Sequence, residues 1–207
     1  MIPAREALDR LREGNRRFVS DAMSREGIGL HARRVELASG QEPFAVILGC
    51  SDSRVPVEIV FDQGLGDLFV IRVAGNIVAP SLIGSVEFAA QRFGTRLVVV
   101  LGHSRCGAVL AALEEAPPDA GVSRNLNSIV GRVRQAIDDS PEVMAASDPA
   151  ERIRRAVRAN IRASARQLRH GSEVIERLER EDGLLVVGAK YSLESGVVDF
   201  FDLADTE

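Results

Sequence analysis

The sequence predicts an α/β fold with a central, mostly parallel β-sheet flanked by helices. Residues 44–49 and 97–102 are runs of apolar residues, rich in valine and leucine, that end in glycine. Such runs are typical of buried parallel strands, which are apolar on both faces. Segments with helical periodicity alternate with these and other strand candidates, and this alternation indicates parallel strands joined by helical crossovers.

The first half of the chain is expected to begin with an amphipathic helix at 4–19, where apolar residues recur at helical spacing between charges. Pro56 suits the first turn of a later short helix, and Gly94 ends a longer one. The other elements expected here are a short helix at 32–39, a strand at 44–49, a short helix at 56–61, a strand at 68–73 and a helix at 81–93.

The second half is expected to continue the same alternation. Gly183 and Gly196 supply turns before the last two strands. The expected elements are a strand at 97–102, a helix that begins near Cys106, helices at 125–137, 149–169 and 172–181, and strands at 184–189 and 197–200.

Composition and charge exclude several partners. The net charge of −4 gives no basic field for nucleic acid, and the seven arginines within 152–169 accompany an apolar stripe of a packed helix. No apolar run approaches the ~20 residues that span a membrane, so no membrane partner is expected. The N-terminal residues lack the apolar core of a secretory signal, and two cysteines cannot build a disulfide framework. These features predict a cytoplasmic protein with reduced thiols.

Chemically active side chains follow directly after two of the predicted strands. Cys50 comes after the strand at 44–49, whereas His103 and Cys106 come after the strand at 97–102. In an open parallel sheet, functional residues gather at the carboxyl ends of neighbouring strands. Two thiolates and one imidazole suit Zn²⁺, and three protein ligands leave the fourth tetrahedral position for water. A catalytic zinc site is therefore predicted.

A disulfide between the two cysteines is the alternative interpretation. It would leave Asp52 and His103, which stand in the same two short motifs, without an explanation. Reduced thiolates that bind a metal account for all four residues.

These motifs resemble the signature of the β-class carbonic anhydrases. The signature consists of Cys50-x-Asp52-x-Arg54 and, about fifty residues later, His103-x-x-Cys106-Gly107. The resemblance extends from about residue 8 to residue 199. Further matches in the same order are Gln41, Gly66-Asp67-x-Phe69-Val70-x-Arg72, Gly84-Ser85-x-Glu87 and Val187-Gly188-x-x-Tyr191 before Gly196.

The resemblance adds details to the predicted fold. It implies a short antiparallel strand at one edge of the sheet and an N-terminal helical arm that embraces a partner subunit. We therefore expect a single domain at 1–207, with the arm at 1–40 and a zinc-binding α/β core at 41–207.

The resemblance also implies an activity, which is the zinc-dependent, reversible hydration of carbon dioxide to bicarbonate and a proton through a zinc-bound hydroxide. Cys50, His103 and Cys106 would bind one Zn²⁺ ion per subunit. Asp52 has two possible roles. It is either a fourth zinc ligand, which closes the site, or a carboxylate that Arg54 holds in a bidentate ion pair and that orients the hydroxide.

Three further residues match substrate-binding positions of the family. Gln41 corresponds to a glutamine that hydrogen-bonds substrate from the neighbouring subunit, which implies a homodimer or a dimer-based homotetramer. Phe69 and Phe88 are expected to form apolar walls for carbon dioxide, although phenylalanines are often plain core residues. Relatives commonly carry tyrosine where Phe88 stands, and phenylalanine lacks the hydroxyl that could relay a proton there.

Two alternative functions remain open from the sequence. The same scaffold and ligands would serve a hydrolase of carbonyl sulfide or carbon disulfide. A protein that binds zinc only for stability, with Asp52 fixed on the metal, would show no turnover because a saturated tetrahedron cannot activate water.

Overall fold

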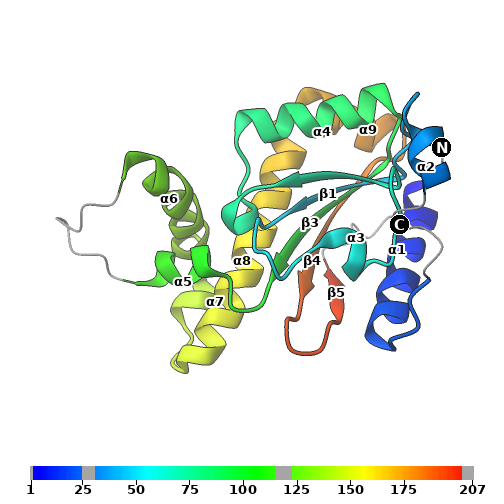
Figure 1. The fold of residues 1–207 in the computed structure, drawn as a ribbon. Coiled ribbons are helices and arrows are strands. Elements are labelled where there is room, and N and C mark those ends of the chain that lie inside the picture. The colour runs from blue at the N-terminus through cyan, green and yellow to red at the C-terminus, as the bar shows by residue number, and fades with distance from the viewer. Residues whose placement is uncertain (1, 25–30, 115–122, 202–207) are drawn as a thin grey trace.

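The fold is built on one mixed five-stranded sheet with the order β2-β1-β3-β4-β5, in a computed structural model that describes residues 2–24, 31–114 and 123–201 (Figure 1). Strands β1 to β4 run parallel, and β5 pairs antiparallel with β4 at the edge. This confirms the predicted fold class, including the antiparallel edge strand. The strands are β1 (Ala45–Gly49), β2 (Leu68–Arg72), β3 (Leu97–His103), β4 (Leu185–Tyr191) and β5 (Val198–Phe201).

Helices cover both faces of the sheet and form two apolar cores with it (Figure 1). On one face lie α1 (Ala4–Val19) and α3 (Val57–Val60); on the other lie α4 (Pro80–Arg92), α8 (Pro149–His170) and α9 (Glu173–Glu181). None of the helices in the described ranges has the length and apolar character that crossing a membrane requires. The remaining helices are α2 (His31–Leu37), α5 (Gly107–Leu113), α6 (Arg124–Asp138) and α7 (Pro141–Met144).

Every helix and strand expected from the sequence is present, and the expected bounds differ from the observed ones by at most two residues. Two one-turn elements were not expected, α7 and the 3₁₀-helix at Ala74–Asn76, since a single turn has too few residues to show a period. The equally short α3 was expected from Pro56 and not from a period. The strand β3 extends one residue further than expected and ends at His103 itself.

The N-terminal helix α1 packs against the sheet of its own chain. Its apolar face, including Leu8 and Leu11, is buried in the core with β1 and β3. Asn15 holds the C-terminal half of α1 in place, because its side-chain amide donates to the carbonyl oxygens of Val60 at 3.1 Å and Gly196 at 2.9 Å. Of the predicted arm at 1–40, α1 is therefore docked on the core, whereas α2 has no buried residue.

The contact of α1 with the residue after α3 gives a stability prediction. A Cβ added at Gly14 would lie 1.8 Å from the carbonyl oxygen of Phe61, so alanine cannot fit there without displacing the helix. We expect Gly14→Ala to lower the free energy of unfolding by about 1–3 kcal/mol, as overpacking of a core does. Chemical denaturation of the purified variant measures this change.

Gly84→Ala is the matched control, because Gly84 also lies within a helix but has nothing within 4 Å of its added Cβ. Alanine there should leave stability unchanged or raise it by up to about 1 kcal/mol. If Gly14→Ala were as stable as Gly84→Ala, the close packing of α1 would be disproved.

Candidate metal centre

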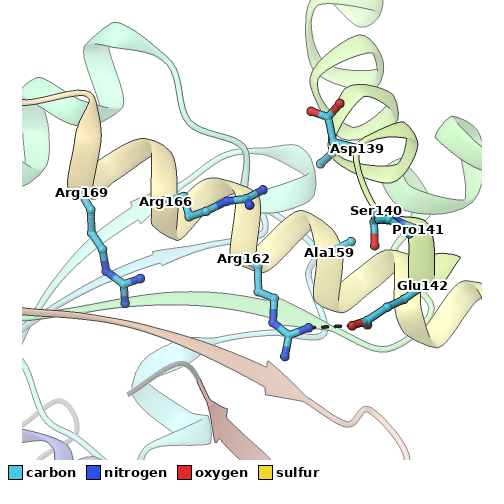
Figure 2. Close-up of a pocket in the computed structure, with 9 residues that line it drawn as sticks. Asp139, Ser140, Pro141, Glu142, Ala159, Arg162, Arg166 and Arg169 are labelled. Atoms are coloured by element: carbon cyan, nitrogen blue, oxygen red, sulfur yellow. Dashed lines mark ion pairs between the residues drawn. The ribbon is translucent and has the colours of Figure 1, made fainter. Parts of the chain in front are cut away.

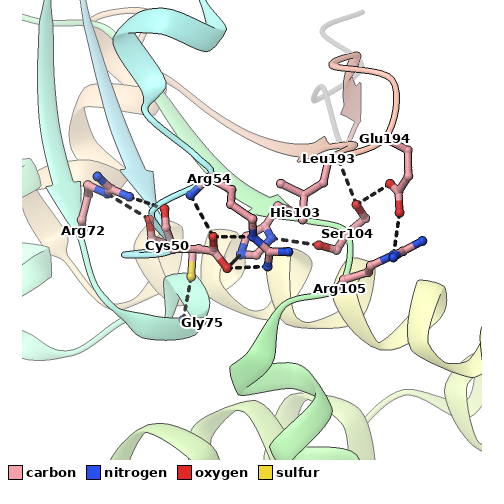
Figure 3. Close-up of polar contacts among 10 residues, drawn as sticks. Cys50, Arg54, Arg72, Gly75, His103, Ser104, Arg105, Leu193 and Glu194 are labelled. Carbon is pink, nitrogen blue, oxygen red and sulfur yellow. Dashed lines mark hydrogen bonds and ion pairs between the residues drawn. The ribbon is translucent and has the colours of Figure 1, made fainter.

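The three predicted metal ligands meet at the carboxyl ends of two adjacent strands. Cys50 directly follows β1, His103 is the last residue of β3, and Cys106 is the N-cap of α5. Their potential ligand atoms all lie within 4.8 Å of one another, and all three residues are buried. Figure 3 shows Cys50 and His103 converging from their two strands. Parallel pairing of β1 with β3 thus assembles the cluster.

Both cysteines are free thiols, so the disulfide alternative is not what the structure shows. A hydrogen bond with Cys106 lowers the pKa of Cys50, and the hydrogen bond that the backbone N–H of Gly75 donates to its sulfur acts in the same direction. The shared hydrogen bond and burial raise the pKa of Cys106. The two sulfurs thus influence each other's ionisation, as expected of atoms that lie close enough to bind one cation together.

Cys106 is the N-cap of α5, which begins at Gly107, one residue from the expected start near Cys106. The N–H groups of Ala108 and Val109 still favour its thiolate, although the contact with Cys50 outweighs them in the pKa of Cys106.

The imidazole of His103 is oriented as a metal ligand requires. Its Nδ1 lies 2.9 Å from the carbonyl oxygen of Ser104, and an N–H donated there leaves the lone pair on Nε2. Among the described residues, Nε2 is buried and has no hydrogen-bond partner. A buried polar atom without a partner costs about 1–3 kcal/mol. A metal ion would remove this cost, so two sulfurs and this nitrogen fit a soft divalent cation such as Zn²⁺.

Asp52 is paired with Arg54 beside the cluster. Nε and Nη2 of Arg54 donate to the two carboxylate oxygens of Asp52 at 2.9 and 2.8 Å, and the backbone N–H of Arg54 adds a bond of 3.0 Å. These contacts hold the pKa of Asp52 well below its usual range. Its Oδ2 lies 3.8 Å from Nε2 of His103. Of the two possible roles for Asp52, the observed geometry corresponds to the bidentate ion pair.

Arg72, at the end of β2, holds the segment that carries Cys50 and Asp52. Its Nε donates to the carbonyl oxygen of Cys50 at 3.0 Å, and its Nη2 donates to that of Asp52 at 2.6 Å (Figure 3). Arg72 was not expected at the metal site, since only the pairing of β2 with β1 brings it there.

A second supporting contact reaches Cys50 from α8. The N–H of Gly75 donates to the sulfur of Cys50 at 3.3 Å, and the buried side chain of Asn160 donates to the carbonyl oxygen of Gly75 at 2.7 Å. Gly75 has a φ of 71°, and a Cβ there would lie 2.9 Å from that of Ala108. Asn160 was not expected at the site. Its place three positions after Val157 on the apolar stripe of α8 indicates a buried polar residue, but it does not indicate which group that residue contacts.

The three predicted substrate residues do not lie at this cluster. The rings of Phe69 and Phe88 are 6.3 Å apart and both contact Phe93, which lines a pocket of about 510 Å³ together with Gln41. Phe69 is in register with Val46, four residues before the first ligand, or about 13 Å along the strand. Gln41, Phe69 and Phe88 thus gather with one another, towards the opposite end of the sheet from the cluster of their own chain.

A further cavity, of about 490 Å³, lies between α8 and the turn from α6 to α7 (Figure 2). Arginines of α8 form one wall, and Asp139 and Glu142 stand on the other, with Arg162 3.8 Å from Glu142. None of the residues of the metal cluster lines this cavity. The arginines belong to the polar face of α8, as expected, because Val157, Ile161 and Leu168 of the same helix are buried.

Comparisons with known proteins agree with the signature motifs. Residues 45–198 match the family model described as carbonic anhydrase. The chain is 36% identical over 186 residues to carbonic anhydrase 2 of Mycobacterium tuberculosis, a match that covers 90% of this chain and 87% of the relative.

Solved structures extend the agreement to the fold. The β-carbonic anhydrase CafA of Aspergillus fumigatus is 27% identical, with a TM-score of 0.75 over 97% of this chain and 91% of that one. A β-carbonic anhydrase of Sordaria macrospora, described as tetrameric, is 27% identical with a TM-score of 0.73 over 81% and 85%. Since the sequence match spans most of the chain and the fold matches as well, the chain belongs to the β-class carbonic anhydrase family, as its motifs predict.

Proposed function

We propose that this protein is a zinc-dependent carbonic anhydrase that interconverts carbon dioxide and water with bicarbonate and a proton. The observation that carries this proposal is the buried cluster of two thiols and one imidazole, with an ion-paired carboxylate beside it. The reduced thiols that such a site needs favour a cytoplasmic location.

Some residues of the site would bind the metal, and others would orient the attacking water. A divalent cation held by Cys50, His103 and Cys106 would act as a Lewis acid and lower the pKa of a water molecule at the site. Asp52 accepts a hydrogen bond from the attacking water and so directs its lone pair at the carbon of the substrate. Arg54 occupies both oxygens of Asp52 and keeps this carboxylate from closing the site.

Stopped-flow measurement of carbon dioxide hydration, on protein whose metal content has been determined, tests the proposal. Activity should rise in proportion to bound zinc and disappear when a chelator removes it. Carbonyl sulfide and carbon disulfide, assayed with the same preparation, test the rival hydrolase. Zinc-loaded protein without carbon dioxide hydration would contradict the proposal.

The proposal includes a second copy of the chain in the active unit. Gln41, Phe69 and Phe88 lie together near β2, which is an edge strand, and Phe88 is 53% exposed. In contact with a second copy of the chain, this surface would bring the amide of Gln41 and the rings of Phe69 and Phe88 to the metal cluster of that copy. The tetrameric relative from Sordaria macrospora supports an oligomer. The division into an arm at 1–40 and a metal-binding core at 41–207 belongs to this proposal.

A complementation experiment tests the shared site. Gln41→Ala should lower kcat/KM about tenfold, the effect of one lost substrate hydrogen bond, and Cys106→Ser should remove the metal. A mixed dimer contains one chain of each variant. Its Gln41→Ala chain keeps all three metal ligands and would receive Gln41 from the Cys106→Ser partner. Refolding the two variants together at equal amounts should restore about a quarter of wild-type activity, since half the dimers are mixed and each has one complete site.

Gln135→Ala is the matched control, because Gln135 is an exposed glutamine on α6. It should keep wild-type kcat/KM. If the refolded mixture is no more active than the average of its two parent variants, Gln41 acts in its own chain or not at all.

A further inference from the structure

The link between two of the metal ligands is very short. Only Ser104 and Arg105 separate His103 from Cys106, and Arg105 has a φ of 54°, a left-handed conformation that side chains with a Cβ disfavour. The position of both ligands therefore depends on how this two-residue link is held.

One carboxylate binds both residues of the link (Figure 3). The hydroxyl of Ser104 donates to Oε2 of Glu194 at 2.8 Å, and Nε of Arg105 lies 2.7 Å from Oε1 of the same side chain. Glu194 belongs to the loop between β4 and β5, which is 90 residues away from Ser104 in sequence. In that loop, Ser192 also donates to Oε2 of Glu194 at 3.2 Å.

Backbone contacts complete the attachment of the link to this loop. The N–H of Ser104 donates to the carbonyl oxygen of Tyr191 at 2.9 Å, and the N–H of Leu193 donates to the Ser104 hydroxyl at 3.0 Å. The carbonyl oxygen of Ser104 in turn lies 2.9 Å from Nδ1 of His103. Contacts therefore run without a break from Glu194 through Ser104 to the imidazole.

We propose that Glu194 is a positioning residue for the metal centre, which holds the link between His103 and Cys106 in the geometry that the bound metal requires and so slows metal release. This inference rests on the proposed metal site. Groups that orient a metal ligand typically change metal affinity by about 10–100-fold. Because Glu194 acts through Ser104 and its side chain is 49% exposed, we expect an effect near the lower end of this range.

Metal release from zinc-loaded protein into an excess of a chromogenic chelator tests the proposal. Glu194→Ala should release zinc about tenfold faster than the wild type. The rate of zinc release from Glu194→Gln should fall between those of the wild type and Glu194→Ala. The glutamine amide oxygen can still accept the hydrogen bond from Ser104, but the side chain lacks the negative charge that attracts Arg105. Release is measured beside thermal unfolding, so that a loss of general stability is recognised.

Glu151→Ala is the matched control. Glu151 is another carboxylate that pairs with two arginines, Arg154 and Arg155, each at 2.7 Å, but it lies in the first turn of α8. The Glu151→Ala variant should release zinc at the wild-type rate, even if its melting temperature falls as much as that of Glu194→Ala.

A double-mutant cycle tests the route of the effect. If Glu194 acts through Ser104, the variant with both Ser104→Ala and Glu194→Ala should release zinc little faster than the faster single variant. Fully multiplicative effects would overturn this route. A metal-loaded wild type that releases zinc as fast as Glu194→Ala would overturn the inference alone, whereas a wild type that binds no metal would overturn the proposed function as well.

Discussion

Replacing Cys106 with serine is expected to remove the bound metal and to reduce carbon dioxide hydration by more than ~100-fold. The thiolate is the form of cysteine that binds metal, and a serine hydroxyl stays protonated at neutral pH. Cys106 is one of only three ligands in the cluster, so two would remain. Loss of a hydrogen bond to a ligand alone costs about 10–100-fold, and loss of the ligand itself should cost more. Elemental analysis and stopped-flow kinetics measure the two effects.

The chain has no third cysteine for a matched control, so Cys50→Ser and the double variant serve instead. Each single variant should lose the metal, and the double variant should lose no further activity, because the ligands act as a unit. Circular dichroism should show intact secondary structure in all three. Full activity in a folded, metal-free Cys106→Ser protein would refute a role for the cluster in catalysis.

Arg54→Ala is expected to lower kcat/KM by about 10–100-fold, the usual effect of losing a residue that orients groups at a metal centre. The variant removes both side-chain bonds to Asp52 and leaves only the backbone N–H on Oδ1. Oδ2, which lies 3.8 Å from Nε2 of His103, can then turn onto the metal. The three ligands remain, so zinc content should stay at the wild-type level. Arg54→Lys should recover only part of the activity, because an ammonium group cannot form the bidentate pair.

Arg180→Ala is the matched control for this change. Arg180 is also an exposed arginine paired with a neighbouring carboxylate, that of Glu181 at 2.7 Å, but it lies on α9. It should keep wild-type kinetics. Wild-type kinetics in Arg54→Ala itself would show that Asp52 needs no clamp.

Most of the fold follows from local patterns in the sequence. The runs at 44–49 and 97–102 are buried along their whole length, which is why continuous apolar character was a sound indicator of central strands. Helix α1 has the bounds expected from its periodicity. The helix α7 and the 3₁₀-helix at Ala74–Asn76 were not predicted, because one turn is too short to show a helical period.

The cluster itself was predictable, but its supports were not. Cys50 and His103 follow strands that pair directly, so the rule for carboxyl ends of parallel strands was sufficient. Arg72, Asn160 and Glu194 reach the site across 22, 85 and 90 residues of sequence, distances at which no local period carries information. These contacts depend on the order of strands and on helix packing.

X-ray absorption at the zinc edge tests the central claim most directly, since that claim is that Cys50, His103 and Cys106 together bind the metal. The account predicts two sulfur atoms at about 2.3 Å and two lighter atoms at about 2.0–2.2 Å, one of them an imidazole nitrogen. The sulfur signal should fall to one atom in any Cys50→Ser protein that retains zinc. A zinc site without sulfur in the wild-type protein would contradict the account.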